Sequence, residues 1–276
     1  LSGEGADEIF GGYNVYSDPG STSYEKLPRG LRRGIMHIAE SLPAHRGVNF
    51  FVRKGKDLEE RFIGNAYMFT PKDRKALLKI HTNAPDPMAI TKPYYDQVKD
   101  QDDVTKMQYL DLHLWMAGDI LLKADKMSMA NSLELRVPFL DKEVMALAQR
   151  IPTRYRVIHK PSESGGTPYI TKYAMRLAAK KDTPPQTAKT AAKKKLGFPV
   201  PIRVWLKEDT YYNMVKNTFE GNAAQQFFHT EKLVQLLDDH RAGKADNSRK
   251  IWTVYMFLVW YHVYFESDVI PTKPNV

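Results

Sequence analysis

The chain has 276 residues, of which 42% are hydrophobic and 26% are charged, and this balance indicates one compact folded unit rather than a disordered segment. It contains no cysteine, which excludes disulfides, thiolate metal sites and a cysteine nucleophile within these residues. The formal net charge of +9 admits two kinds of anionic partner, a nucleic acid or a nucleoside triphosphate.

The first thirteen residues read LSGEGADEIFGGY and predict a tight turn followed by a helix. Gly3 and Gly5 flank Glu4, so the backbone can turn sharply and bring its amide groups close to a phosphate. Glu4 can then face a ligand as a proton acceptor, or it can lie on an ordinary surface turn. Asp7 and Glu8 fall where the helix would begin, and acids at that place most often act as caps.

Helical periodicity dominates the rest of the chain and clear alternating strands are hard to find, so we expect a mostly α fold. The longest helix is expected from Val104 to about Ala130, with Asp103 as its cap, because apolar residues recur there at three- and four-residue spacing. The expected helices lie at residues 31–41, 72–80, 104–130, 141–150, 168–180, 202–208, 231–240 and 248–265. Proline and glycine clusters predict loops at residues 18–23, 85–93, 161–168 and 182–195.

Charged residues mark the end of the longest predicted helix and the segment after it. Asp119, Lys123 and Lys126 share one helical face, a pattern typical of a solvated charge stripe. Glu134 and Arg136 then alternate with apolar residues in an extended stretch. They would either pair with each other or contact a substrate, and the pattern leaves both alternatives open.

A lysine run, Lys193 to Lys195, leads into Gly197 and Pro199. Lysine is a mobile point charge suited to a triphosphate or pyrophosphate, and the alternative is a flexible basic linker. The rigid turn after the run favours a phosphate-contacting loop over a stripe that binds nucleic acid. The apolar run 251–265 is shorter than the roughly 20 residues of a membrane span, so we interpret it as a buried core helix.

Three motifs in this order resemble the synthetase domain of asparagine synthetases. They are LSGEGADEIFGGY at residues 1–13, KADKMSMANSLELRVPFLD at residues 123–141 and KKKLGFPVP at residues 193–201. The segment TKYAMRLAA at residues 171–179 also resembles that family, so the likeness spans essentially the whole chain.

The resemblance implies a reaction in which the side-chain carboxylate of aspartate attacks the α-phosphate of ATP, giving a β-aspartyl adenylate and pyrophosphate. Ammonia then displaces AMP to form asparagine. The family's motifs imply that Glu4 orients or deprotonates the ammonia and that Lys195 holds the departing pyrophosphate. They imply nucleotide contacts for Ser2, Gly3, Gly5, Asp7 and Lys123. For Asp125, Glu134 and Arg136 the match allows either a site role or a bracing role.

The resemblance also implies what lies outside the chain. We expect residues 1–276 to be the helix-rich C-terminal part of an α/β ATP pyrophosphatase domain. The family's loop Ser-Gly-Gly-x-Asp-Ser and its glutaminase domain are expected upstream of Leu1, and the pattern of that loop does not occur in these residues. The chain alone should therefore be inactive, because parts outside it would largely hold ATP and Mg²⁺.

The implied partners are aspartate, ATP, ammonia or glutamine, and the glutaminase domain, in a cytoplasmic enzyme that needs neither a membrane nor a nucleic acid. A homodimer is also compatible with the family. Relatives with related loops make β-lactam rings or modify peptides and sugars, so another acceptor is one alternative. A non-catalytic basic module that binds nucleic acid is an alternative from a different class.

Overall fold

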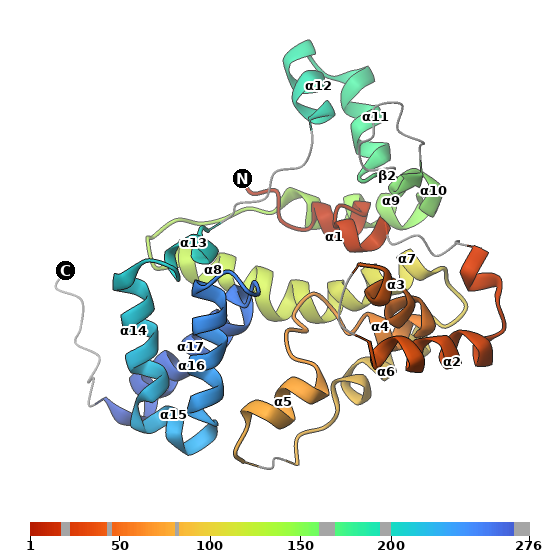
Figure 1. The fold of residues 1–276 in the computed structure, drawn as a ribbon. Helices are drawn as coiled ribbons and strands as arrows, with labels where there is room; N and C mark the ends of the chain where they lie inside the picture. Colours follow the sequence, from red (N-terminus) through yellow and green to blue (C-terminus); the bar gives the residue numbers. More distant parts are fainter. Residues whose placement is uncertain (18–22, 43–45, 81–82, 160–168, 194–199, 268–276) are drawn as a thin grey trace. The chain divides into compact units, whose positions relative to one another are not determined.

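The computed structural model describes residues 1–17, 23–42, 46–80, 83–159, 169–193 and 200–267. This part of the chain is almost entirely helical (Figure 1), which confirms the prediction of a mostly α fold. The one sheet among the described residues is a pair of two-residue strands, β1 (Ile158–His159) and β2 (Tyr169–Ile170), which run antiparallel.

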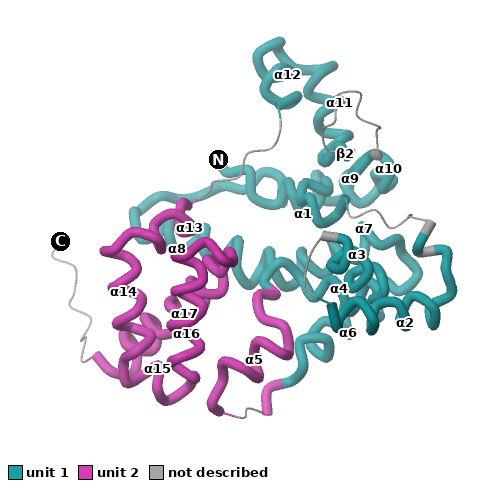
Figure 2. The backbone as a smooth tube through the Cα atoms, in the orientation of Figure 1, with its two compact units in different colours: residues 1–66, 85–195 teal, residues 67–84, 196–276 magenta. Residues whose placement is uncertain are grey.

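The chain divides into two compact units where its composition indicated one (Figure 2). Unit 1 comprises residues 1–66 and 85–195, and unit 2 comprises residues 67–84 and 196–276. The short stretch 67–84 belongs to unit 2 because Leu77 is buried in the same core as Phe219 and Leu233. The periodicity of apolar residues within a segment does not show which distant segment it packs against, so this assignment could not be predicted.

Unit 1 holds the N-terminal helix and the long central helical stretch. Its elements are α1 (Ala6–Phe10), η1 (Asn14–Ser17), η2 (Ser23–Lys26), α2 (Arg29–Glu40), α3 (Arg46–Gly55), α4 (Leu58–Arg61), α6 (Pro87–Gln97), α7 (Asp103–Leu110), η3 (Asp111–Leu121), α8 (Leu122–Met129), η4 (Pro138–Leu140), α9 (Lys142–Arg150), α10 (Thr153–Arg156), β1, β2, α11 (Tyr173–Asp182) and α12 (Pro185–Ala192).

The long helix predicted from residue 104 to about 130 is confirmed as the continuous run of α7, η3 and α8. Its centre, η3, is a π-helix rather than an α-helix. The predicted cap is wrong by one residue: the Oδ1 atom of Asp102 accepts hydrogen bonds from the backbone N–H groups of Val104 and Thr105, each at 3.1 Å. Asp103 instead makes an ion pair with Arg61 at 3.1 Å.

Two buried clusters anchor unit 1, and both involve the start of the chain. Ile9 and Phe10 of α1 pack with Ala148 of α9. The second cluster contains Tyr16, Phe62, Tyr95, Met107 and Leu110. Because α1 is part of the core, the start of the loop in front of it is held in place.

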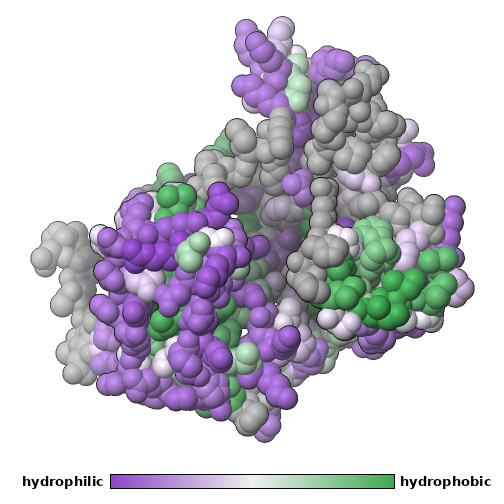
Figure 3. Space-filling view, viewed as in Figure 1, coloured by the Kyte–Doolittle hydropathy of each residue, from purple (hydrophilic) through white to green (hydrophobic). Residues whose placement is uncertain are grey.

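Figure 3 shows a hydrophobic surface patch over the α2 and α3 part of this unit, where Leu31 and Ile38 are exposed.

Unit 2 is a helical bundle around one apolar core. Its elements are α5 (Pro71–Leu77), α13 (Ile202–Trp205), α14 (Asp209–Glu220), α15 (Asn222–Phe227), α16 (Thr230–Arg241), α17 (Ser248–Tyr261) and η5 (His262–Glu266). Leu233, Leu237 and Ile251 are completely buried in that core.

The interpretation of 251–265 as a buried core helix is right for only one face of α17. Ile251, Val254 and Leu258 are buried, whereas Trp252 and Trp260 are 41% and 47% exposed. In the part of the chain that the structure describes, no helix has the length and apolar character needed to cross a membrane.

Two of the predicted loops are largely helical. Most of 85–93 belongs to α6, whose first residue is Pro87 and whose N-cap, Asp86, accepts a hydrogen bond from the Met88 backbone N–H at 2.8 Å. Proline at the first position of a helix costs no intrahelical hydrogen bond, because the N–H group there has no partner within the helix. The buried Tyr95 hydroxyl donates to the Phe62 carbonyl oxygen at 2.6 Å, which fastens α6 to the rest of unit 1. In the same way, α12 occupies much of 182–195. Helices α3, α4, α10, α14 and α15 fall outside every predicted helix.

Candidate active site

The glycine-rich start forms the predicted turn and leads into α1. Gly5 has a φ of +88°, and a Cβ there would lie 2.3 Å from the Leu140 Cδ2 atom, so conformation and packing both require glycine. At Gly3 an added Cβ would meet no heavy atom within 4 Å. The backbone on one side of Glu4 is therefore packed against the fold and on the other side is open.

Glu4 and Lys123 are far apart in the sequence, but the fold brings them together. The Glu4 Oε1 atom lies 3.8 Å from the Lys123 Nζ atom, with the two side chains 31% and 55% exposed. An ion pair this exposed contributes little to stability. The significance of the contact is its position, which places a carboxylate and an ammonium group at the mouth of the glycine-rich loop.

An open hollow of about 630 Å³ lies between α8 and the extended segment that follows it. The Ser2 backbone N–H donates to the Arg136 carbonyl oxygen at 2.8 Å, so the glycine-rich loop is tied to this segment. Glu134 and Arg136 form an ion pair at 2.7 Å, as in the alternative in which these two residues pair with each other. The hollow is lined by Leu121, Ala124, Asp125, Met129, Ser132, Glu134, Leu135 and Val137.

Asp7 is held by Lys172, a residue that the sequence did not single out. The Lys172 Nζ atom lies 3.0 Å from the Asp7 Oδ1 atom, and each side chain is 22% exposed. Lys172 adopts a left-handed backbone conformation with φ of 52°, and its N–H donates to the Gly11 carbonyl oxygen at 3.2 Å. A Cβ at Gly12 would lie 1.8 Å from Asp7 Oδ1. Asp7 is therefore a fixed anchor of α1, whereas its expected cap role is not seen, since α1 has no side-chain cap hydrogen bond.

Glu8 points into the protein rather than capping the helix. It is 2% exposed, and its Oε1 atom accepts a hydrogen bond from the Tyr13 hydroxyl at 2.5 Å. Burial raises the pKa of the Glu8 carboxyl above its ordinary value. Its backbone carbonyl oxygen accepts from the Gln108 amide at 2.5 Å, so α1 is fastened to α7 beneath the loop.

Asp111 is a second buried acid, at the start of the π-helix. It is completely buried, and its Oδ2 atom accepts hydrogen bonds from the Tyr16 hydroxyl at 2.5 Å and from the Asn65 amide at 2.7 Å. Its Oδ1 atom has no hydrogen-bond partner. Burial raises the pKa of this carboxyl to about 7.

The raised pKa of Asp111 predicts a pH-dependent stability. Between the ordinary value of 3.8 and about 7, the folded state binds more protons at this site than the unfolded state. The free energy of unfolding should therefore fall as pH rises through that window, by at most about 1.4 kcal/mol per pH unit from this group. Asp111→Asn cannot ionise, so its free energy of unfolding should fall less over the same window. Urea unfolding at about pH 5 and about pH 8 measures the difference.

The control for this prediction is Asp100→Asn, which changes an exposed aspartate in the same way. It should follow the parent chain at both pH values. An Asp111→Asn variant with the same pH dependence as the parent would show that the buried carboxyl is ionised in the folded state throughout.

Lys195 lies in 194–199, outside the described residues, so the structure does not place it.

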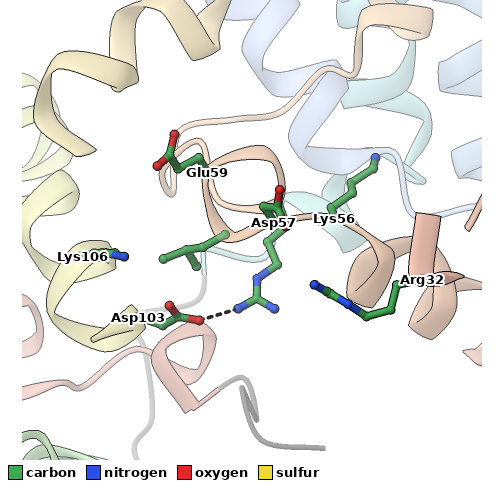
Figure 4. A pocket seen from close by; sticks show the side chains of 8 residues that line it. Arg32, Lys56, Asp57, Glu59, Asp103 and Lys106 are labelled. Carbon is green, nitrogen blue, oxygen red and sulfur yellow. Dashed lines mark hydrogen bonds and ion pairs between the residues drawn. The ribbon is translucent and has the colours of Figure 1, made fainter. Parts of the chain in front are cut away.

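A second hollow, of about 320 Å³, is lined by charged residues of unit 1 that include Arg32, Lys106 and the Arg61–Asp103 ion pair (Figure 4). None of the predicted site residues lines it. No cluster of three or more His, Asp or Glu side chains suited to a metal ion occurs among the described residues.

Comparison with known proteins extends these observations. The family model described as asparagine synthase matches residues 1–262. Asparagine synthetase [glutamine-hydrolyzing] 1 of Bacillus subtilis is 45% identical over 275 residues, which cover 99% of this chain and 42% of that protein. The putative asparagine synthetase [glutamine-hydrolyzing] of Mycobacterium tuberculosis is 40% identical over 279 residues, covering 98% of this chain and 40% of that protein. The chain thus spans about two fifths of the length of these relatives, and no solved structure matches it.

Proposed function

The chain belongs to the asparagine synthase family, and on that premise we propose that it is the C-terminal part of the synthetase domain of an enzyme that converts aspartate to asparagine. The enzyme would use ATP and ammonia drawn from glutamine. The names of two relatives at 40% identity or more support the reaction: one is named a glutamine-hydrolysing asparagine synthetase and the other a putative one. Their greater length supports the assignment of the glutaminase and of the main triphosphate site to residues outside this chain.

The proposed chemistry has two steps. In the first, an oxygen of the aspartate side-chain carboxylate bonds to the α-phosphorus of ATP, and the bond from that phosphorus to the bridging oxygen breaks, releasing pyrophosphate. In the second, the ammonia nitrogen bonds to the side-chain carbonyl carbon of β-aspartyl-AMP, and AMP leaves with the electron pair of the broken carbon–oxygen bond. The nitrogen must lose a proton as it attacks.

We assign to Glu4 the role of accepting that proton. The observation that carries the proposal is its setting: a carboxylate on a turn that is packed on the Gly5 side and open on the Gly3 side, with the Lys123 Nζ atom 3.8 Å away. A carboxylate within reach of the attacking nitrogen can orient it and accept its proton. Lys123 lies close enough to balance the charge on Glu4 without covering it.

The residues present fit part of a nucleotide. At Gly3 the backbone has open space that a Cβ would occupy, as expected for close approach by a phosphate or ribose group, and we assign Ser2 and Gly3 to that contact. Gly5 and Asp7 then maintain the shape of the loop and its anchor. The described residues include no group of three or more His, Asp or Glu side chains that could hold a metal ion by themselves, and no step is assigned to Mg²⁺.

The proposal predicts a sharp contrast between two preparations. The full-length protein, meaning this chain with the remaining length of its relatives, should release pyrophosphate from ATP only when aspartate is present and should form asparagine with ammonium chloride or glutamine. The 276-residue chain alone should do neither, because it lacks the pattern of the family's triphosphate loop. A coupled pyrophosphate assay and amino-acid analysis measure both.

Two results would contradict parts of this proposal. Aspartate-dependent pyrophosphate release by the 276-residue chain would show that it holds ATP unaided. Pyrophosphate release by the full-length protein with a different carboxylic acid, but not with aspartate, would show that aspartate is not the substrate. The proposed adenylation step would still stand.

A further inference from the structure

The side-chain amide of Gln108, on α7, connects an arginine to the backbone of α1. Its Nε2 atom donates to the Glu8 carbonyl oxygen at 2.5 Å, and its Oε1 atom accepts from the Arg156 Nη1 atom at 2.9 Å. Gln108 is only 3% exposed, and Arg156, on α10, is half-buried. Three helices that lie far apart in the sequence thus meet at one side chain.

The partners of this amide allow it only one orientation. A guanidinium group only donates hydrogen bonds and a carbonyl oxygen only accepts them, so the amide oxygen must face Arg156 and the amide nitrogen must face Glu8. Arg156 is itself fixed, because its Nε atom donates to the Ile151 carbonyl oxygen at 2.8 Å and its Nη1 atom donates to the Thr105 hydroxyl at 3.4 Å. The donor that Gln108 offers to α1 therefore has a defined direction.

The hydrogen bond from Gln108 reaches α1 in its last turn, where backbone carbonyl groups have no partner within the helix. At the same end of α1, the C-cap residue Gly11 has a φ of +72°, and a Cβ there would lie 3.3 Å from the Arg156 Cβ atom. Helix α10 therefore approaches α1 closely. Because a helix of five residues is too short to be stable alone, contacts of this kind must hold α1 in place.

The position of α1 determines where Glu4 lies. The Gly5 carbonyl oxygen, one residue after Glu4, accepts from the Ile9 N–H at 3.0 Å. The Gly3 carbonyl oxygen, one residue before it, accepts from the Ala6 N–H at 3.3 Å. Both neighbours of Glu4 are thus hydrogen-bonded to α1, so a displacement of this helix should also displace the Glu4 carboxylate.

Ser2 is held from a different segment. Its N–H donates to the Arg136 carbonyl oxygen at 2.8 Å, in the extended stretch after α8. A displacement of α1 should therefore move Glu4 more than it moves Ser2 and the nucleotide contact assigned to Ser2.

We propose that Gln108 is a positioning residue for the ammonia step, which holds α1, and through it Glu4, where the carboxylate can accept the proton of the attacking nitrogen. Arg156 supports this role by fixing the orientation of the Gln108 amide. The inference rests on the proposed function and adds two residues to it. Gln108 need not touch the substrate, because its amide oxygen and nitrogen both bind groups of the chain itself.

Gln108→Glu in the full-length protein tests this role. Glutamate has the size of glutamine and keeps an acceptor for Arg156, but an ionised carboxylate has no donor for the Glu8 carbonyl oxygen. Asparagine formation from aspartate, ATP and ammonium chloride should fall by about 10- to 100-fold, as expected when a catalytic group is displaced by roughly 1 Å. Aspartate-dependent pyrophosphate exchange should change little, because Ser2 is held separately.

The matched control is Gln101→Glu, the same substitution at an exposed position just before α7. It should equal the parent in both half-reactions.

A double-mutant cycle with Glu4→Gln shows whether the effect passes through Glu4. In the Glu4→Gln background, Gln108→Glu should lower asparagine formation by no more than about twofold, because the base that it positions is already absent. A general weakening of the fold would instead add its full loss in either background.

Three results would overturn the inference: normal asparagine formation in Gln108→Glu, equal losses in both half-reactions, or losses that multiply in the double variant. If Gln108→Glu does not fold, Arg156→Lys should show the same selective loss, because an ammonium group does not reproduce the planar donor arrangement of a guanidinium. Normal asparagine formation by Arg156→Lys would then overturn it.

Hydrogen exchange on the same preparations gives a reading independent of activity. The Ile9 amide, which donates to the Gly5 carbonyl oxygen, should exchange faster in Gln108→Glu than in the parent, because α1 is held less firmly. Equal protection of this amide in the two proteins would also contradict the positioning role.

The two proposals fail in different ways. A parent protein that forms no asparagine would contradict the proposed function. An active parent with a slow Glu4→Gln and a normal Gln108→Glu would contradict the positioning role alone.

Discussion

Glu4→Gln in the full-length protein should reduce asparagine formation by about 10²- to 10⁴-fold, the loss expected for removing a general base. Glutamine keeps the size of the side chain and much of its hydrogen bonding, and the half-buried position of Glu4 should tolerate it. Adenylation does not require this base, so aspartate-dependent pyrophosphate exchange should persist. Measuring the two half-reactions and the melting temperature on one preparation separates the ammonia step from the rest.

The matched control for Glu4→Gln is Glu143→Gln, the same substitution at an exposed position on α9. It should leave both half-reactions unchanged. A turn residue without a catalytic role would give a different pattern at position 4, with a lower melting temperature and both half-reactions reduced together. Near-normal asparagine formation by Glu4→Gln would remove this carboxylate from the reaction.

Local signals in the sequence predicted the elements whose stability is local. The helices at 31–41, 141–150 and 231–240 match α2, α9 and α16 closely, because each has a clear apolar face. The turn at Gly3 to Gly5 follows in the same way from the conformational freedom of glycine. The failures have tertiary causes, as in α6, where the buried Tyr95 helps to keep a proline-containing segment helical.

The candidate site could be predicted only in part. Glu4 and Lys123 were both singled out, but their contact depends on how α8 packs, which spacing along the chain does not report. Asp111 left a signal that was missed: it lies four residues after Met107 and three before Leu114, on the apolar face of the predicted helix. A charged residue in that position is expected to be buried and to have hydrogen-bond partners. Lys172 left no local signal, because its role comes from its contact with Asp7.

Lys195→Ala should slow adenylation in the full-length protein by about 2 to 4 kcal/mol in the barrier, comparable to the loss of one electrostatic stabiliser of a transition state. The negative charge on the leaving oxygens of pyrophosphate grows as the bond to the α-phosphorus breaks, and a positive charge beside them lowers the energy of that state more than it favours aspartate binding. The aspartate-dependent pyrophosphate exchange rate should therefore fall while the KM for aspartate changes little.

Lys189→Ala, which removes an exposed charge from α12, is the control for general electrostatic effects of the basic surface. It should exchange pyrophosphate at the parent rate, because a charge that only contributes to the net +9 of the chain is screened over about 10 Å at ordinary ionic strength. An exchange rate in Lys195→Ala equal to that of Lys189→Ala would instead identify the lysine run as a solvated linker. Lys195→Ala should thus slow the formation of the adenylate, whereas Glu4→Gln should slow the later attack of ammonia on it. A variant of either residue that slowed both steps equally would contradict this division of roles.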